Sequence, residues 1–177
     1  MDTQAKILIV DDDAFVRGVY AERFKESGFI VSEAQDGQEA YEFLEKQNVD
    51  IIFTGIIMPR MTGFDLAEKL RADKQLHTIP VVFSSHRGKD EDRKRAEDLG
   101  AKDFVVSGFV SPNEVVERIR KIITTSRSYE ITLVPDDPGV RALHRDFPSL
   151  GEHNVYRLRL VPKDKNGTTF DAELIPE

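Results

Sequence analysis

The sequence has no cysteine, which excludes a disulfide framework and thiolate chemistry. It has no apolar run approaching the roughly 18 residues that a membrane span needs. Its first residues, MDTQAKILIVDDD, contain no apolar segment followed by a small-residue cleavage site of the kind that marks a secretory leader. We therefore expect a cytoplasmic protein with no membrane partner.

Basic residues are also in short supply. The chain has 25 Lys and Arg against 32 Asp and Glu, so its formal net charge is −7. Residues 1–126 and residues 127–177 are each acidic. Because proteins that contact the phosphate backbone need a basic surface, the sequence predicts no nucleic-acid partner. The hydrophobic share of 40% is that of an ordinary folded protein.

Short apolar runs rich in β-branched residues alternate with amphipathic segments up to about residue 126. The candidate strands are Lys6–Val10, Phe29–Ala34, Asp50–Thr54, Pro80–Ser84 and Asp103–Val106. The candidate helices are Phe15–Gly28, Gly37–Gln47, Gly63–Ala72, Asp90–Leu99 and Pro112–Thr125. Strands that are apolar throughout are typical of parallel sheets buried on both faces. The sequence thus predicts an α/β domain at 1–126, with a doubly wound five-stranded parallel sheet.

Polar residues gather where these strands end. They are Asp11, Asp12 and Asp13 after the first strand, Gly55 after the third, Ser84, Ser85 and His86 at the fourth, and Ser107 and Gly108 after the fifth. Ligands of such sheets bind beyond the carboxyl ends of the strands. Carboxylates that converge there could hold a divalent cation, or Asp12 or Asp13 could simply cap the first helix. The spacing leaves both interpretations open.

The motifs carry a family resemblance. Between residues 5 and 125 the chain reads KILIVDDD, GFIVSEAQDGQEA, DIIFTGIIMPRMTGFDL, IPVVFSS, DEDRKRAEDLGAKDFVV and SGF. In this order and spacing they resemble the receiver domain of two-component response regulators. The resemblance implies a flavodoxin-like fold. It also implies a site at which a histidine kinase transfers a phosphoryl group to an aspartate. In the family, an acidic pair holds Mg²⁺, and a hydroxyl residue and a lysine bind the phosphoryl oxygens.

Several of the family's functional positions keep their residue type. The resemblance places the Mg²⁺-binding acidic pair at Asp11 and Asp12, the hydroxyl switch residue at Ser85 and the aromatic switch residue at Phe104. A metal held by Asp11 and Asp12 alone should bind weakly or not at all, since Mg²⁺ usually also needs phosphate oxygens. We therefore expect no cofactor beyond weakly bound Mg²⁺.

Two positions that decide the chemistry do not keep the family's residue type. The phosphoacceptor falls on Gly55, and the lysine of the family's Lys-Pro-Phe turn falls on Ser107. Glycine cannot form an acyl phosphate. The resemblance therefore implies a degenerate phosphorylation site, a pseudo-receiver that is not an enzyme. The turn peptide is usually cis in the family, but without proline a cis bond costs about 2.5–4 kcal/mol. We expect a trans bond from Ser107, with Gly108 absorbing the change in path.

Two basic residues follow the fourth strand. His86 and Arg87 could neutralise Asp11 or Asp12 where no phosphate arrives, because an arginine–carboxylate contact is strong. The alternative is that both are solvated loop residues.

Residues 127–177 read as a small β-rich extension. YEITLV at 129–134 predicts one strand. VYRLRLV and TTFDAELI flank Lys165-Asn166-Gly167, which predicts a hairpin that pairs Leu160 with Ala172 and Leu158 with Leu174. A core this thin favours docking on the receiver-like domain, pairing as a homodimer, or forming the start of a larger domain.

Two functions follow from the resemblance. The first is a phosphorylation-independent signalling adaptor that binds other signalling proteins through the fourth helix, fifth strand and fifth helix. The alternative is a receiver joined to a PilZ-like module, because Arg141 and Arg145 form an RxxxR motif of the kind with which that family binds cyclic di-GMP.

Overall fold

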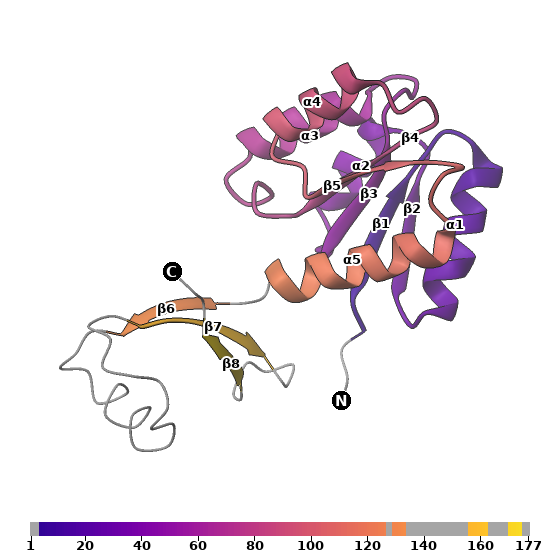
Figure 1. Ribbon diagram of the computed structural model, residues 1–177. Coiled ribbons are helices and arrows are strands. Elements are labelled where there is room, and N and C mark those ends of the chain that lie inside the picture. Colours follow the sequence, from indigo (N-terminus) through magenta and orange to yellow (C-terminus); the bar gives the residue numbers. More distant parts are fainter. Residues whose placement is uncertain (1–3, 127–128, 134–155, 163–169, 175–177) are drawn as a thin grey trace. The chain divides into compact units, whose positions relative to one another are not determined.

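In this computed structural model the described residues are 4–126, 129–133, 156–162 and 170–174, with side chains described up to residue 124 (Figure 1). The chain divides into two compact units, the first ending at Ile123 and the second beginning at Thr124. Each unit is described by itself. No helix among the described residues is long and apolar enough to cross a membrane.

The first unit alternates strands and helices as predicted. Its strands are β1 (Lys6–Val10), β2 (Ile30–Ala34), β3 (Ile51–Gly55), β4 (Val81–Ser85) and β5 (Asp103–Val106). Its helices are α1 (Ala14–Glu26), α2 (Gly37–Leu44), α3 (Gly63–Ala72), α4 (Asp90–Asp98) and α5 (Pro112–Ser126).

The five strands form one parallel sheet in the order β2-β1-β3-β4-β5. The predicted α/β fold with a doubly wound sheet is therefore confirmed. The register aligns the carboxyl ends of the strands, pairing Val10 with Thr54, Gly55 with Ser84 and Ser85 with Val106. The order reverses between β1 and β3, and this switch point is where such sheets bind ligands.

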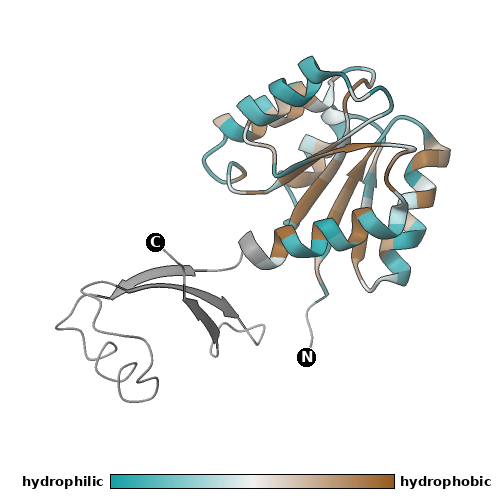
Figure 2. Cartoon of the chain, viewed as in Figure 1, coloured by the Kyte–Doolittle hydropathy of each residue, from teal (hydrophilic) through white to brown (hydrophobic). Residues whose placement is uncertain are grey.

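Helices cover both faces of the sheet because alternate strand residues point to opposite sides. On one face Ile7, Ile9 and Phe53 pack under α1 and α5. On the other, Leu8 and Val10 pack under α2 and α3, with a further cluster under α4. The central strands are mostly hydrophobic, whereas the helices carry hydrophilic and hydrophobic residues in alternation (Figure 2).

Local signals fix the ends of α1. The Asp13 carboxylate caps the helix by accepting the N–H groups of Phe15 at 2.8 Å and Val16 at 3.2 Å. Of the two capping candidates in the sequence, Asp13 is thus the cap, which leaves Asp12 available at the strand edge. Gly28 follows the helix with φ of +86°, as expected for a glycine stop signal.

The second unit contains an antiparallel sheet of β6 (Tyr129–Leu133), β7 (Tyr156–Pro162) and β8 (Phe170–Leu174), in that order. Strands β7 and β8 pair Leu158 with Leu174 and Leu160 with Ala172, the register that the sequence predicts. The predicted nucleotide-binding residues Arg141 and Arg145 lie outside the described residues, as does the predicted hairpin turn.

Candidate functional site at the carboxyl edge of the sheet

The end of β1 contributes two carboxylates of different character. Asp11 is buried, with 9% of its surface exposed, and its Oδ1 accepts the backbone N–H of Asp13 at 2.9 Å. Arg17 donates a hydrogen bond of 2.6 Å to the Asp11 carbonyl oxygen and fixes the backbone there. Asp12 is exposed. The first carboxylate is therefore held in place, while the second is free to turn.

Burial raises the pKa of the Asp11 carboxyl above its ordinary value. The hydrogen bond from the Asp13 N–H lowers it, the nearby charge of Asp12 raises it, and His86 lowers it to a smaller extent. Desolvation outweighs the favourable contacts because the charged form loses water that two partners do not replace.

Gly55 lies against Asp11. A Cβ placed on this glycine would lie 3.3 Å from Asp11 Oδ2 and 3.6 Å from Asp11 Cγ. A side chain at position 55 would therefore start beside the carboxylate of Asp11. The loop after β3 runs close by, since a Cβ on Gly63 would lie 2.0 Å from the Gly55 carbonyl oxygen.

The predicted switch residues lie at β4 and β5. Ser85 Oγ accepts the N–H groups of Arg87 at 3.3 Å and Gly88 at 3.2 Å, so this hydroxyl organises its own loop. Phe104 is buried, and the Arg93 guanidinium lies 4.8 Å from its ring centroid.

Ser107 belongs to a cluster of three hydroxyls, with those of Ser84 and Tyr20. Its Oγ lies 2.7 Å from Ser84 Oγ, and it interacts with the hydroxyl of the buried Tyr20. Burial raises the pKa of Tyr20, the Ser107 contact lowers it, and the Asp11 charge raises it. The position at which the sequence resemblance expects the family's lysine is Ser107, which lies in a neutral hydroxyl cluster. Tyr20 was not predictable as a site residue, because its place on the apolar face of α1 indicates only a core residue.

The peptide bond after Ser107 is trans, as predicted, because no cis bond occurs among the described residues. Gly108 follows with φ of +91°, a left-handed conformation that glycine adopts without strain.

The loop between β3 and α3 is tied to the start of α2 by an ion pair that no motif of the sequence predicts. Arg60 adopts φ of +59°, and its Nε donates to Asp36 Oδ2 at 2.5 Å. Asp36 is 1% exposed and also accepts the N–H groups of Gln38 and Glu39. Burial alone would raise the pKa of Asp36, but the Glu39 N–H and the Arg60 guanidinium outweigh it and hold the pKa low.

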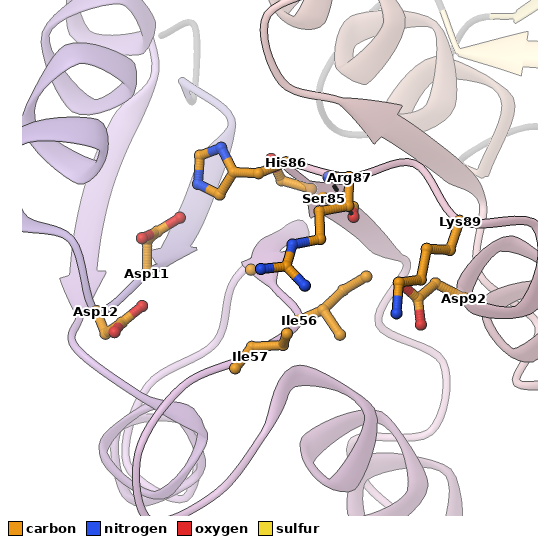
Figure 3. A pocket seen from close by; sticks show the side chains of 11 residues that line it. Asp11, Asp12, Ile56, Ile57, Ser85, His86, Arg87, Lys89 and Asp92 are labelled. Atoms are coloured by element: carbon orange, nitrogen blue, oxygen red, sulfur yellow. Dashed lines mark hydrogen bonds between the residues drawn. The ribbon is translucent and has the colours of Figure 1, made fainter.

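These strand ends enclose a pocket of about 350 Å³. Asp11 and Asp12 line one side, and Arg87 and Lys89 line another (Figure 3). The His86 ring projects toward Asp11, and Arg87 reaches toward the middle of the pocket (Figure 3). Four of the five predicted phosphorylation-site positions, Asp11, Asp12, Gly55 and Ser85, therefore line one cavity, whereas Ser107 lines a second groove that shares His86 with it.

The described residues fit Mg²⁺ poorly. Asp11 and Asp12 supply two carboxylates, but Asp11 Oδ1 already accepts an N–H and position 55 supplies no third one. No group of three or more His, Cys, Asp or Glu in the described part of the chain could hold a metal. Hard divalent cations prefer several oxygen ligands, so these residues provide an incomplete set.

Residues 7–120 match the response regulator receiver domain family. The chain belongs to this family. A receiver is a signalling domain and not a classical enzyme. The receiver fold is shared with solved structures. The chemotaxis response regulator CheY4 of Vibrio cholerae is 28% identical, with a TM-score of 0.63 over 68% of this chain and 99% of that one. The Francisella response regulator 1452 receiver domain is also 28% identical, with a TM-score of 0.62 over 68% of this chain and 97% of that one.

Curated proteins similar to this chain are named as transcriptional regulators. Transcriptional regulatory protein SrrA of Staphylococcus aureus is 33% identical over 171 residues, which cover 96% of this chain and 68% of that protein. Probable transcriptional regulator ycf27 of Guillardia theta is 33% identical over 123 residues, which cover 70% of this chain and 47% of that protein. The chain thus spans about half the length of the second relative.

These names contradict the prediction that nucleic acid is excluded as a partner. That prediction rested on the net charge of −7. It was wrong because a net charge averages over the whole surface, whereas phosphate contacts depend on a local basic patch. Nothing among the relatives supports the cyclic di-GMP alternative.

Proposed function

We propose that this chain is a pseudo-receiver, a signalling adaptor of the two-component type that works by protein–protein interaction without being phosphorylated. The observation that carries the proposal is the pair of Gly55 and Asp11. A side chain at position 55 would point at the acidic edge, yet this residue supplies no carboxylate. An acyl phosphate needs a carboxylate nucleophile, so phosphoryl transfer has no acceptor at this position.

The end of β5 supports the same conclusion. Ser107 stands where the family has its lysine, and its hydroxyl is already engaged with Ser84 and Tyr20. A neutral hydroxyl network offers no positive charge to a phosphoryl group, and such charge is a large part of how protein sites stabilise phosphate. Acceptor and cation are thus both absent from their expected positions.

We further propose that α4, β5 and α5 form the surface that binds signalling partners. Arg118 on α5 contacts Asp103 at 3.4 Å and Glu114 at 2.8 Å. Together with Arg93 over Phe104, these contacts give the face an ordered pattern of both charges. Such a pattern supports specificity more than affinity.

Exposed aromatic residues suggest a second contact region beside the site. Phe15 is 80% exposed and Phe109 is 88% exposed, and both line one groove next to Tyr20. Large apolar side chains left in water at one place commonly mark protein interaction sites. We propose that this groove contributes to partner binding.

Acetyl phosphate with Mg²⁺ tests the proposal. The full chain should keep its intact mass, because it has no acceptor at position 55. A matched control in the same chain is the double variant Gly55→Asp with Ser107→Lys, which supplies both missing groups and should gain an acid-labile phosphoryl adduct. An acid-labile adduct on the unaltered chain within residues 50–60 would refute the pseudo-receiver.

Transcriptional control is a second candidate, favoured by the alignment with SrrA over 96% of this chain. In that case the chain would belong to a regulator that acts on DNA. Fluorescence anisotropy with duplex DNA over a range of salt concentrations tests it, since phosphate contacts make binding weaken steeply with salt. We also propose that the protein is cytoplasmic, that its domain boundary lies near residue 126 and that it forms a homodimer. Light scattering on the full chain tests homodimer formation.

A further inference from the structure

The pocket at the carboxyl edge is lined by groups of both charges, with Asp11 and Asp12 at the end of β1 and with Asp92 beside Lys89 at the N-terminal end of α4 (Figure 3). Its lining includes three carboxylates, those of Asp11, Asp12 and Asp92, and three basic side chains, those of His86, Arg87 and Lys89. Asp12 lies on the β1 side, while Arg87 and Lys89 lie on the side of β4 and α4 (Figure 3). Within residues 4–124, the side chains of Asp12, Arg87 and Lys89 form no ion pair or hydrogen bond.

One buried atom in this pocket lacks a donor. Asp11 is 9% exposed, and its Oδ1 accepts the Asp13 N–H. Its Oδ2 receives no hydrogen bond from the described residues and faces the open side of Gly55, 3.3 Å from where a Cβ would lie. Buried polar atoms are almost always paired with protein, water or ligand, so this oxygen is a place where a bound donor would be stabilised.

The size of the pocket limits what can enter. Its volume of about 350 Å³ lies at the low end for small-molecule sites, which range over about 300–1,000 Å³. Gly55 contributes no side chain to fill it. Ile57 lines the pocket and is 77% exposed, which offers apolar contact to a ligand's side chain. A metabolite of amino-acid size suits these dimensions.

We propose that this pocket binds a small zwitterion, an α-amino acid, whose ammonium group contacts Asp11 and Asp12 and whose carboxylate contacts Arg87 and Lys89. The ammonium would supply the donor that Asp11 Oδ2 lacks. The inference deepens the proposed function, because a non-covalent ligand would then regulate the site that phosphorylation cannot reach.

Ligands of a single charge fit the lining less well. A free anion such as inorganic phosphate would be attracted by Arg87 but repelled by the facing carboxylates. A lone metal cation would contact the carboxylates of Asp11 and Asp12, but Asp11 Oδ1 already accepts the Asp13 N–H, which leaves too few oxygen ligands. A ligand with separated charges satisfies both sides, since each of its groups meets the opposite sign.

The test uses the full chain with each of the twenty protein amino acids as probes. Thermal unfolding at millimolar probe concentration should show a rise in Tm for at least one amino acid, because a ligand that binds the folded state stabilises it. Calorimetry with that amino acid should then give a dissociation constant. Asp12→Asn and Arg87→Gln should each weaken binding by about tenfold or more, the equivalent of about 1.4 kcal/mol.

Matched controls separate a specific pocket from general charge effects. Glu22→Gln and Lys94→Gln remove exposed charges of the same kinds elsewhere on α1 and α4, and should leave affinity unchanged. The N-acetylated and amidated forms of the bound amino acid each lack one charge and should bind at least tenfold more weakly.

Three results would overturn the proposal: no amino acid binds, affinity survives both pocket substitutions, or inorganic phosphate or Mg²⁺ alone binds while amino acids do not. None of these results bears on phosphorylation, which the acetyl phosphate experiment measures separately.

Discussion

Asp11 holds its Oδ2 beside Gly55, at 3.3 Å from the point where a Cβ on that glycine would lie. The carboxylate therefore occupies part of the space that a side chain at position 55 would need. Introducing an aspartate there would place another negative charge against a carboxylate that is already buried, and this crowding should lower stability.

Gly55→Asp should destabilise the chain by about 1–3 kcal/mol in the absence of metal, through like-charge repulsion and burial. Gly55→Asn, which has nearly the same shape without the charge, should cost less. Adding Mg²⁺ should recover stability in the aspartate variant only, because the third carboxylate completes a set of oxygen ligands. Urea unfolding with and without Mg²⁺ measures all three. Equal stability of the two variants without metal would contradict this prediction.

Because the pKa of Asp11 is raised, replacing this residue by a neutral one should increase the stability of the fold by an amount that depends on pH. A carboxyl whose pKa is higher in the folded state favours folding in its protonated form, and the folded state loses that advantage as pH rises through the folded pKa. Asp11→Asn should therefore raise Tm at pH 7, and the gain should fade as pH drops toward the ordinary aspartate value of about 3.9. In a chain of this size each kcal/mol corresponds to about 2–4 °C.

Glu22→Gln is the control for this effect, since Glu22 is exposed on α1 and its charge is not among the causes of the Asp11 shift. Thermal unfolding of both variants at a series of pH values between about 4 and 7 checks the prediction. A loss of stability in Asp11→Asn at pH 7 would show that its charge is compensated in the folded state.

Arg60 combines a left-handed backbone with a contact to buried Asp36, and substitutions can separate the two. Arg60→Ala should cost about 1.5–3 kcal/mol, because it removes a charged hydrogen bond and keeps the unfavourable φ. Arg60→Gly should be about 1 kcal/mol less damaging, since glycine accepts that φ. Chemical unfolding of the variants gives the order directly, and an alanine variant as stable as the unaltered chain would rule out the ion pair as a stabilising contact.

The same pair predicts an acid sensitivity. Because the pKa of Asp36 is lowered in the folded state, its contribution is present above the ordinary aspartate value and is lost as pH falls through the lower folded pKa. The stability difference between the unaltered chain and Arg60→Ala should accordingly shrink in acid. A constant difference from pH 7 down to strongly acid solution would disagree with this assignment.

The hydroxyl cluster at the end of β5 predicts energetic coupling between Tyr20 and Ser107. Tyr20→Phe and Ser107→Ala should each cost about 0.5–1.5 kcal/mol, and the double variant should cost less than their sum. A double-mutant cycle by urea unfolding measures the coupling. Ser111→Ala with Tyr20→Phe is a matched pair, and its effects should simply add. Additive effects in both cycles would mean that the Tyr20–Ser107 contact carries no energy of its own.

The sequence predicted the fold well where periodicity and caps are strong. The bounds of β1, β5 and α3 agree to the residue with the expected Lys6–Val10, Asp103–Val106 and Gly63–Ala72. Helix α2 ends at Leu44 instead of Gln47, where an amphipathic pattern does not define a stopping point. Local periodicity specifies an element more reliably than its last turn.

The site was predictable only in part. The motif spacing predicted that Asp11, Gly55 and Ser85 lie at the carboxyl edge of the sheet, because parallel strands end at the same edge. It could not reveal that Arg60 binds Asp36 or that Tyr20 reaches Ser107, since these partners are joined by tertiary packing between distant parts of the chain. The direction of a side chain in a loop has no periodic signature in sequence.

The glycines near the site differ in what they permit. At Gly63 a Cβ would lie 2.0 Å from a carbonyl oxygen, so no other residue fits without moving the backbone. At Gly55 the nearest obstacle is a carboxylate at the end of a short side chain, and the backbone is not left-handed. Saturation mutagenesis should therefore find position 63 intolerant and position 55 permissive. The fold therefore requires glycine at position 63 but not at position 55, so under the proposed function the missing carboxylate is not a consequence of how the backbone packs.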